Sequence, residues 1–259
     1  SRLPPILQGA PAGRKLKAGL VGAGARGTGA AINFISAGPG LEIIALADVF
    51  QDKIDACRKR FASFNLPVPA ENCFVGFDAY KKLIAIPDID VVLLATPPHF
   101  RPEHFLEAVL NNKHVFMEKP VAVDPVGIRS VITSAKKAQA IGLNVVTGTQ
   151  RRHQEDYIET YKQIKNGAIG RITSAKAYWN QDHVWFRERE KGWNDMEYMI
   201  RNWNNFCWLC GDHILDTHVH NIDVINWFMG KYPEKAIGYG GRHRRVTGDQ
   251  YDFFSIDFD

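Results

Sequence analysis

The chain has 259 residues and is 45% hydrophobic, which is enough for one large domain or two ordinary domains with a buried core. Its net charge is only +4 and its basic residues form no run, so neither nucleic acid nor a charged membrane surface is indicated as a partner. No apolar stretch approaches the roughly 20 residues that a membrane-spanning helix requires.

The two ends of the chain differ from its middle. Residues 1–15 are rich in proline and glycine without a repeat, which indicates an extended arm, and no signal peptide is visible. At the other end, YDFFSIDFD (251–259) stops inside an alternating, strand-like pattern. We therefore expect the sequence to be truncated there.

Residues 16–148 alternate short apolar runs with amphipathic helical patterns. The candidate strands are 17–22, 41–48, 90–96, 114–118 and 143–148. Helical patterns lie between most of them, which is typical of βαβ units in a parallel sheet with helices on both faces. This part of the chain is therefore predicted to be a doubly wound Rossmann domain.

The first strand runs into a glycine loop, Gly22-Ala-Gly24-Ala-Arg-Gly27. Gly22 allows a tight turn, Gly24 lets the backbone approach a pyrophosphate, and Gly27 lets the next helix pack closely on the strand. The amino end of that helix would offer free N–H groups to the phosphates. A glycine-rich turn without a ligand is the alternative, but the position between a strand and a helix favours a dinucleotide site.

The second strand ends in Asp48, 21 residues after Gly27. This is the spacing of an acid that accepts hydrogen bonds from the adenosine ribose hydroxyls. A carboxylate there repels a 2′-phosphate, and Val49 and Phe50 supply no cation to offset it, so NAD is favoured over NADP. Arg26 lies close enough in the sequence to weaken this preference without reversing it.

Two further stretches carry a resemblance to a known family. The segment ATPPHFRPEHFLEAVLNNKHVFMEKP (95–120) resembles the one that identifies the glucose–fructose oxidoreductase and inositol dehydrogenase family (Gfo/Idh/MocA). TGTQRRH (147–153), followed by IKNGAIGRI (164–172), looks like that family's crossover into a second domain. The likeness covers nearly the whole chain after the N-terminal arm. Its carbohydrate-acting subgroup includes exported members, so the location stays open between the cytoplasm and export.

The resemblance implies a two-domain enzyme. A substrate-binding α/β domain over 149–259, with an open and mainly antiparallel sheet, would follow the Rossmann domain. It would contain a helix over 155–166, a strand over 170–180 and a helix over 214–229. Further cofactor contacts are expected from Ala25, Arg26, Thr96, Pro97, His99, Glu118 and Lys119. Arg101 and His153 depart from the family pattern, which leaves the identity of the substrate in doubt.

The stretch LDTHVHNID (215–223) packs two histidines and two aspartates into nine positions. On one helix over 214–229, Asp216, His220, Asp223 and Trp227 fall in a narrow arc, while His218 points away from His220. The two histidines could not then share a metal ion, and no third ligand is obvious, so no metal is expected. Two interpretations of this cluster remain, a solvated polar helix face and a proton relay, and the proton relay is favoured.

The resemblance also implies the catalytic residues. In the family, the lysine of Glu-Lys-Pro and an Asp-x-x-x-His pair act on the reacting hydroxyl, and the matching residues are Lys119, Asp216 and His220. The same three residues are expected to hold the substrate, together with Arg152, His153 and Trp203. Pro120 is expected to follow a cis peptide bond, since such bonds are nearly confined to X-Pro. A surface lysine after a strand is the alternative reading of Lys119.

Three classes of function remain open. The favoured one is an NAD-dependent dehydrogenase that oxidises or reduces a ring hydroxyl of a sugar, glycoside or cyclitol. The second is an NAD-dependent glycoside hydrolase or lyase that oxidises a ring carbon transiently. The third is a non-catalytic NAD-binding regulator, which would not need the three residues above together.

A carbohydrate substrate is supported by polar and aromatic side chains in the second domain. They are Arg151, Arg152, His153, Trp179, His183, Trp203, Asn204 and Trp208. Cys207 and Cys210 have the spacing of a redox motif, but they do not follow the first strand of a βαβ unit and are expected to be buried thiols. An open sheet leaves a face or edge to cover, so a homodimer or homotetramer is predicted.

Overall fold

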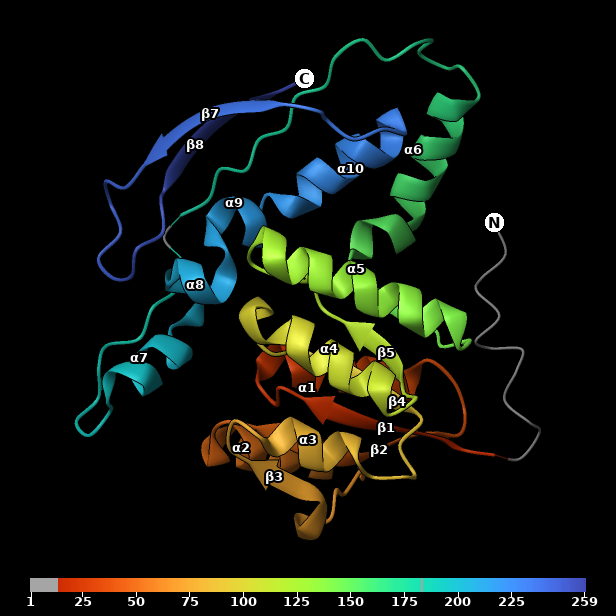
Figure 1. Cartoon of the computed structure of the whole chain (residues 1–259), viewed down its shortest axis with the longest axis vertical. Coiled ribbons are helices and arrows are strands. Elements are labelled where there is room, and N and C mark those ends of the chain that lie inside the picture. Colours follow the sequence, from red (N-terminus) through yellow and green to blue (C-terminus); the bar gives the residue numbers. More distant parts are fainter. Residues whose placement is uncertain (1–13, 183) are drawn as a thin grey trace. The chain divides into compact units, whose positions relative to one another are not determined.

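The computed structural model describes residues 14–182 and 184–259, so the N-terminal arm expected over 1–15 lies almost entirely outside the described residues. The chain forms two compact units (Figure 1). Among the described residues, the first comprises 14–96, 100–121 and 125–147, and the second comprises 97–99, 122–124 and 148–259.

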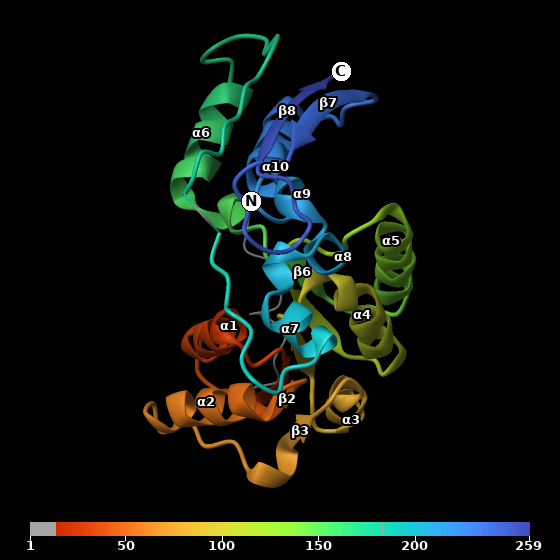
Figure 2. The same ribbon diagram turned by 90° about the vertical axis from the view of Figure 1, so that its left-hand side faces the viewer.

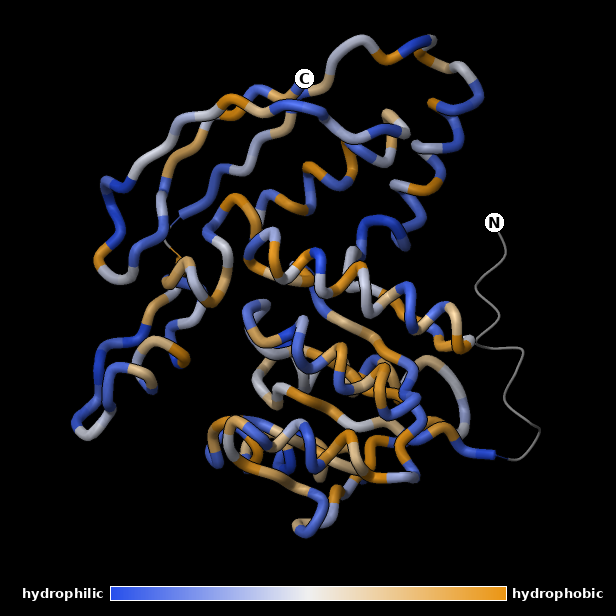
Figure 3. The backbone as a smooth tube through the Cα atoms, viewed as in Figure 1, coloured by the Kyte–Doolittle hydropathy of each residue, from blue (hydrophilic) through white to orange (hydrophobic). Residues whose placement is uncertain are grey.

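The first unit is built on a six-stranded parallel sheet in the order β3-β2-β1-β4-β5-β6. The strands are β1 (Leu16–Val21), β2 (Leu41–Asp48), β3 (Cys73–Val75), β4 (Val91–Leu94), β5 (His114–Met117) and β6 (Val145–Thr147). Figure 3 shows the hydrophobic colouring of the central strands, as expected for strands buried on both faces. The five strands expected from the sequence are confirmed, whereas the three-residue β3 was not predicted.

Helices cover both faces of this sheet (Figure 2). They are α1 (Ala25–Ser36), α2 (Gln51–Ala62), α3 (Ala79–Ile84), α4 (Arg101–Leu110) and α5 (Pro125–Ala140), with the short turns η2 (Ala70–Asn72) and η3 (Pro98–Phe100). Phe61 of α2 packs with Leu20 and Leu46 in one core, and Phe105 of α4 packs with Leu94 and Met117 in the other. This arrangement is the predicted Rossmann domain.

The strand register aligns four strand ends at one edge of the sheet. Val21 pairs with both Ala47 and Leu94, and Leu94 pairs with Met117. Gly22 directly follows Val21, and Asp48 directly follows Ala47. Thr96 and Lys119 each come two residues after a paired strand end, namely Leu94 and Met117. In parallel sheets this carboxyl edge is where ligands bind.

The second unit is mostly helical. Its helices are α6 (Glu155–Lys165), α7 (Asp195–Arg201), α8 (Cys207–Cys210), α9 (Asp212–Asp216) and α10 (Val219–Met229), with the turns η4 (Gln150–His153) and η5 (Trp203–Asn205). β7 (Ala236–Gly241) and β8 (Phe253–Phe258) form a two-stranded antiparallel sheet. The expected helix over 155–166 and the strand-like pattern at 251–259 are confirmed.

Two expectations for this unit are wrong. Residues 170–180 form no strand, because within 14–182 and 184–259 no other segment pairs with their backbone. The single helix over 214–229 is divided into α9 and α10 by a turn at Thr217 and His218. The arc that placed Asp216 and His220 on one helical face therefore does not exist.

Candidate functional site

The glycine loop leaves room for a phosphate group at one position only. A Cβ on Gly22 would lie 2.7 Å from the backbone of Thr96, and one on Gly27 would lie 1.8 Å from the carbonyl oxygen of Gly22. Gly22 also has a φ of +97°, which disfavours any side chain. At Gly24, in contrast, a Cβ would meet nothing within 4 Å. Gly24 is the N-cap of α1, so this open space lies at the amino end of the helix, where a pyrophosphate is favoured.

Asp48 is fixed at the end of β2 by backbone donors. Its Oδ2 accepts a hydrogen bond from Ala23 N at 2.8 Å, and its Oδ1 accepts one from Phe50 N at 3.0 Å. Each oxygen keeps a second lone pair for a ribose hydroxyl. Burial raises the pKa of this carboxyl above its ordinary value, although the two N–H groups act in the opposite direction.

Arg26 is held by Glu118. Its Nε and Nη2 both lie 2.6 Å from Glu118 Oε1, and the Glu118 side chain is 8% exposed. A guanidinium paired in this way is a poor partner for a 2′-phosphate, because the carboxylate already neutralises it. The ion pair therefore removes the one feature that weakened the expectation of NAD. These residues together fit NAD, which supplies a hydride acceptor when it is bound.

Thr96 is oriented by a histidine that the sequence analysis did not single out. The Nδ1 of His104 lies 3.3 Å from Thr96 Oγ1, and its ring lies 4.1 Å from the ring of Tyr80. Burial, with a smaller contribution from Arg101, lowers the pKa of His104 to about 3. The ring is therefore neutral at physiological pH and acts as a fixed hydrogen-bonding partner.

Lys119 directly follows the carboxyl edge of the sheet in the first unit. Its peptide bond to Pro120 is cis, as expected from the sequence. Asp216 and His220 belong to the second unit, where their side chains are 8% and 9% exposed. The solvated polar face is thus excluded for these two residues. Their convergence with Lys119 on one substrate stays a prediction.

Trp179 lies beside His220, and Arg151 lies over the ring of Trp179. The ring of Trp179 is stacked with the imidazole, with centroids 6.1 Å apart and 23° between the planes. The Arg151 guanidinium carbon lies over the same indole ring at 5.6 Å from its centroid. Trp179, expected to stack on a sugar, is therefore in contact with side chains of its own unit.

Asn221, next to His220, ties two segments to α10. Its Oδ1 accepts a hydrogen bond from Arg151 Nη1, and its Nδ2 donates to the carbonyl oxygen of Tyr178 at 2.8 Å. Asn221 could not be identified as a site residue from the sequence, because periodicity identifies helical faces and not contacts with segments 43 and 70 residues away. Its position beside His220 was the only signal in the sequence.

Arg152, a predicted substrate contact, is held by Asp223. The Nε and Nη2 atoms lie 2.8 Å from the two carboxylate oxygens, and the guanidinium lies 5.4 Å from the centroid of Trp227. The hydrogen bond with Asp223 raises the pKa of Arg152. A substrate hydroxyl would have to share this bidentate pair.

The other predicted sugar contacts that the structure describes lie on η4, η5 and α8 of the second unit. His153 is exposed on η4, and Trp203 lies edge-on to Trp185 at 6.5 Å. Trp208 packs against His99, a predicted cofactor contact, with ring centroids 5.0 Å apart. Asn204 lies between Trp203 and Asn205 in η5, and His183 lies outside the described residues.

His218 and the two cysteines have packing roles. The ring of His218 lies 5.2 Å from the ring of His213 and 6.0 Å from that of Phe254, so this histidine packs against aromatic neighbours. Burial raises the pKa of Cys210 to about 12 and raises that of Cys207 as well. Because the thiolate is the reactive form, this environment opposes a redox role.

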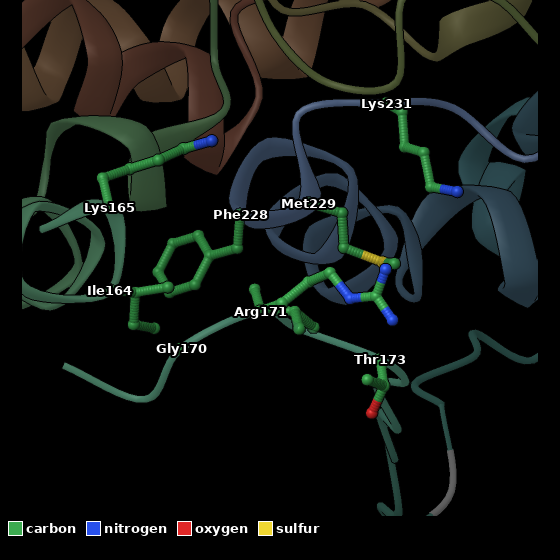
Figure 4. Close-up of a pocket in the computed structure, with 9 residues that line it drawn as sticks. Ile164, Lys165, Gly170, Arg171, Thr173, Phe228, Met229 and Lys231 are labelled. Atoms are coloured by element: carbon green, nitrogen blue, oxygen red, sulfur yellow. The ribbon is translucent and has the colours of Figure 1, made fainter. Parts of the chain in front are cut away.

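A cavity of about 520 Å³ lies at the carboxyl ends of α6 and α10 (Figure 4). It is lined by Ile164, Lys165, Gly170, Arg171, Ile172, Thr173, Phe228, Met229 and Lys231. None of these described residues is a carboxylate, histidine or cysteine, so the cavity offers no group that exchanges protons near neutral pH. Phe228 follows His220 by eight residues, or about 12 Å along the helix. This cavity is therefore separate from His220 and the ring of Trp179 beside it.

Among the described residues, no group of three or more His, Cys, Asp or Glu side chains could hold a metal ion. Within the same residues, no helix is both long and apolar enough to span a membrane.

The fold and the glycine-loop site define a dinucleotide-binding protein with a second α/β unit. Residues 16–146 match the family described as oxidoreductase family, NAD-binding Rossmann fold, and residues 161–259 match its C-terminal alpha/beta domain. The chain belongs to this GFO/IDH/MocA family of oxidoreductases. The expected family, fold class and cofactor NAD are confirmed.

Two curated relatives match most of this chain. Glycosyl hydrolase family 109 protein 1 of Bacteroides fragilis is 33% identical over 92% of this chain and 51% of its own length. Inositol 2-dehydrogenase of Acidothermus cellulolyticus is 25% identical over 91% of this chain and 60% of its own length. The chain thus spans roughly half the length of these relatives.

Solved structures share the fold. Scyllo-inositol dehydrogenase from Lactobacillus casei, with bound NAD(H) and scyllo-inositol, is 23% identical with a TM-score of 0.64, covering 90% of this chain and 62% of its own. Aldose-aldose oxidoreductase from Caulobacter crescentus is 20% identical with a TM-score of 0.71, covering 95% and 67%.

Proposed function

We propose that this protein is an NAD-dependent dehydrogenase that oxidises or reduces a ring hydroxyl of a sugar, glycoside or cyclitol. The observation that carries the proposal is the combination of a fitted NAD site with a buried Asp216 and His220 in the second unit. The inositol dehydrogenase among the relatives supports a cyclic polyol as substrate. A non-catalytic regulator would have no use for a buried acid and base in its second unit.

The roles of the three residues follow from the chemistry of a secondary alcohol. Its hydroxyl proton must leave as the hydride leaves the carbon. His220 accepts this proton, since a neutral imidazole has one ring nitrogen with a free lone pair, and Asp216 orients it or the substrate. Lys119 donates a hydrogen bond to the alcohol oxygen and polarises it. Arg152, His153 and Trp203 bind the remaining hydroxyls and C–H faces of the ring.

Turnover of variants tests this proposal. With NAD and a panel containing myo-inositol, scyllo-inositol, glucose and methyl glucoside, absorbance at 340 nm should rise for at least one compound. Lys119→Ala and His220→Ala should each lower kcat by about 10²- to 10⁴-fold, and the Kd for NAD should stay unchanged in His220→Ala. Asp216→Asn should cost less, and EDTA should have no effect.

His218→Ala is the matched control, because this histidine packs against His213 and Phe254. It should leave kcat near the parental value. Loss of turnover in His218→Ala but not in His220→Ala would contradict the assignment of the base.

A second function, glycoside cleavage through transient oxidation, is favoured by the 33% identity to a glycosyl hydrolase family 109 protein. In that route bound NAD would take the hydride from the ring carbon, and loss of the proton next to the new carbonyl would expel the leaving group as its protonated alcohol. Water would then add across the resulting double bond, and the hydride would return from NADH to the carbonyl carbon. No NADH then accumulates. Release of p-nitrophenol from p-nitrophenyl glycosides without a rise at 340 nm would favour the hydrolase; NADH formed in proportion to product would favour the dehydrogenase.

A further inference from the structure

Arg101 is a buried cation whose place in the fold is fixed. It is the first residue of α4 and is only 4% exposed. The first turn of this helix is anchored to α3, because Tyr80 Oη donates to Glu103 Oε1 at 2.7 Å. Phe105 and Ala108 of the same helix are fully buried in the core. The backbone from which the Arg101 side chain extends is therefore held in place.

One nitrogen of Arg101 bridges the backbone on both sides of Lys119. Nη1 donates to the carbonyl oxygen of Glu118 at 2.9 Å and to the carbonyl oxygen of Pro120. An Nη group carries two hydrogens in one plane, so it can bind two carbonyls in one fixed geometry. The residue between these carbonyls is Lys119, whose side chain carries the proposed contact with the substrate oxygen.

The contact has no evident purpose for the core alone. Burying a charged group is costly unless hydrogen bonds satisfy it, and the sheet edge could be closed by apolar side chains at lower cost. The Nη1 group of Arg101, which donates to the two carbonyls around Lys119, fixes the backbone from which the lysine extends. Errors of about 1 Å in the placement of a reacting group can lower rates about 100-fold.

We propose that Arg101 is a positioning residue, which holds the backbone on both sides of Lys119 and so aims its ammonium group at the substrate oxygen. This inference rests on the proposed role of Lys119. It assigns to Arg101 a task that does not involve touching substrate or cofactor.

Lys113 provides a matched control within the same unit. It is 7% exposed and donates to three backbone carbonyls, those of Ile86 at 2.9 Å, Pro87 at 3.3 Å and Ile89 at 2.8 Å. It is thus a second buried cation that binds carbonyls, but it precedes β5, whereas Lys119 follows β5. Lys113→Met and Arg101→Met should therefore lower thermal stability in a similar way.

The two variants should differ in catalysis. Below the unfolding temperature of both, Arg101→Met should lower kcat about 10- to 100-fold with the Kd for NAD unchanged, while Lys113→Met keeps the parental kcat. Arg101→Lys retains a cation with several hydrogens and should recover part of the loss. In a Lys119→Ala background, Arg101→Met should cause no further loss, because it acts through Lys119.

A second measurement reports on Lys119 without activity. Trace acylation of the NAD-loaded protein with acetic anhydride, followed by mass spectrometry, gives the reactivity of the Lys119 amine relative to the other lysines. It should change severalfold in Arg101→Met and not in Lys113→Met. Unchanged reactivity of Lys119 in Arg101→Met would overturn the inference; parental turnover of Lys119→Ala would instead overturn the proposed function.

Discussion

The ionisation of the Asp48 side chain is subject to opposing effects. Burial disfavours its charged form and raises its pKa, while the N–H groups of Ala23 and Phe50 favour that form. The ribose hydroxyls also need the ionised oxygens as acceptors. Cofactor binding should therefore depend on pH over a range set by the raised pKa of this group.

We expect NAD affinity to be constant above that pKa and to weaken as the pH falls through it. The weakening should begin at a higher pH than an ordinary aspartate, with a pKa of about 3.9, would give. Isothermal titration of NAD between pH 7.5 and 4.5 measures this. Asp48→Asn should bind NAD more weakly at neutral pH and show a flatter profile; an equally steep profile in this variant would exclude Asp48 as the cause.

His104 makes the stability of the first unit dependent on pH. Its pKa is about 3 in the folded protein and about 6.5 when exposed in the unfolded chain. Between these values the unfolded chain binds a proton that the folded protein does not, so stability is fully present above 6.5 and is lost as the pH falls. At pH 5 the loss should reach about 2 kcal/mol.

Urea unfolding at pH 7.5 and pH 5 tests this expectation. The parent should lose more free energy of unfolding between the two pH values than His104→Gln, whose side chain does not titrate. Identical losses in the two proteins would mean that other groups govern the acid sensitivity.

At the scale of elements, the sequence predicted best where a local pattern sufficed. The strands and glycine loop of the first unit follow from apolar runs and turn residues whose meaning is local. The helix over 214–229 failed because Thr217 and His218 are weak helix formers, and His218 packs against His213 and Phe254. Periodicity cannot detect such tertiary contacts.

In the segment 171–182, an expected strand is not formed, and the reason is a missing partner. The family resemblance implies a strand over 170–180, but a strand also needs a partner, and no other segment of the described residues pairs with this one. Side-chain contacts with α10 hold it instead, at Tyr178 through Asn221 and at Trp179 through His220. We therefore expect this segment to depend on Asn221.

Asn221→Ala should increase hydrogen exchange and proteolytic cleavage within 171–182 while the first unit is unaffected. Asn221→Asp keeps the acceptor for Arg151 but loses the donor to the Tyr178 carbonyl, so it should show an intermediate effect. Asn226→Ala on the same helix is the control, since within the described residues no hydrogen bond of its side chain reaches this segment. Equal protection in Asn221→Ala and Asn226→Ala would show that the tie is dispensable.

Across the molecule, the sequence predicted which residues belong to the candidate site better than it predicted which residues they form hydrogen bonds with. Gly24 and Asp48 carry a spacing that reports their roles directly. The bonds of Arg101 to the Lys119 loop and of Arg26 to Glu118 join residues 17 to 92 positions apart. Only the fold brings such residues together, which is why the hydrogen bonds around Lys119 could not be predicted from a motif.

The sheet of the second unit has an apolar surface that needs cover. Ile237 is 80% exposed, Tyr239 is 73% exposed and Phe253 is 50% exposed. The register places them on one face, because Ile237 lies opposite Asp257, Tyr239 opposite Ser255, and Phe253 opposite Gly241. Within the described residues, both edges of this sheet also leave backbone groups unpaired with any other strand.

We expect this face to associate with a second subunit, giving a homodimer or homotetramer. Light scattering of the complete chain at micromolar concentration should then report a multiple of its monomer mass. Ile237→Lys combined with Tyr239→Lys should shift the mass towards the monomer, because charges on an apolar interface must be desolvated without partners. Val126→Lys, at a residue 68% exposed on α5, is the matched control and should keep the parental mass. A monomeric parent would contradict the prediction, and an oligomer unaffected by the paired substitution would move the interface to another surface.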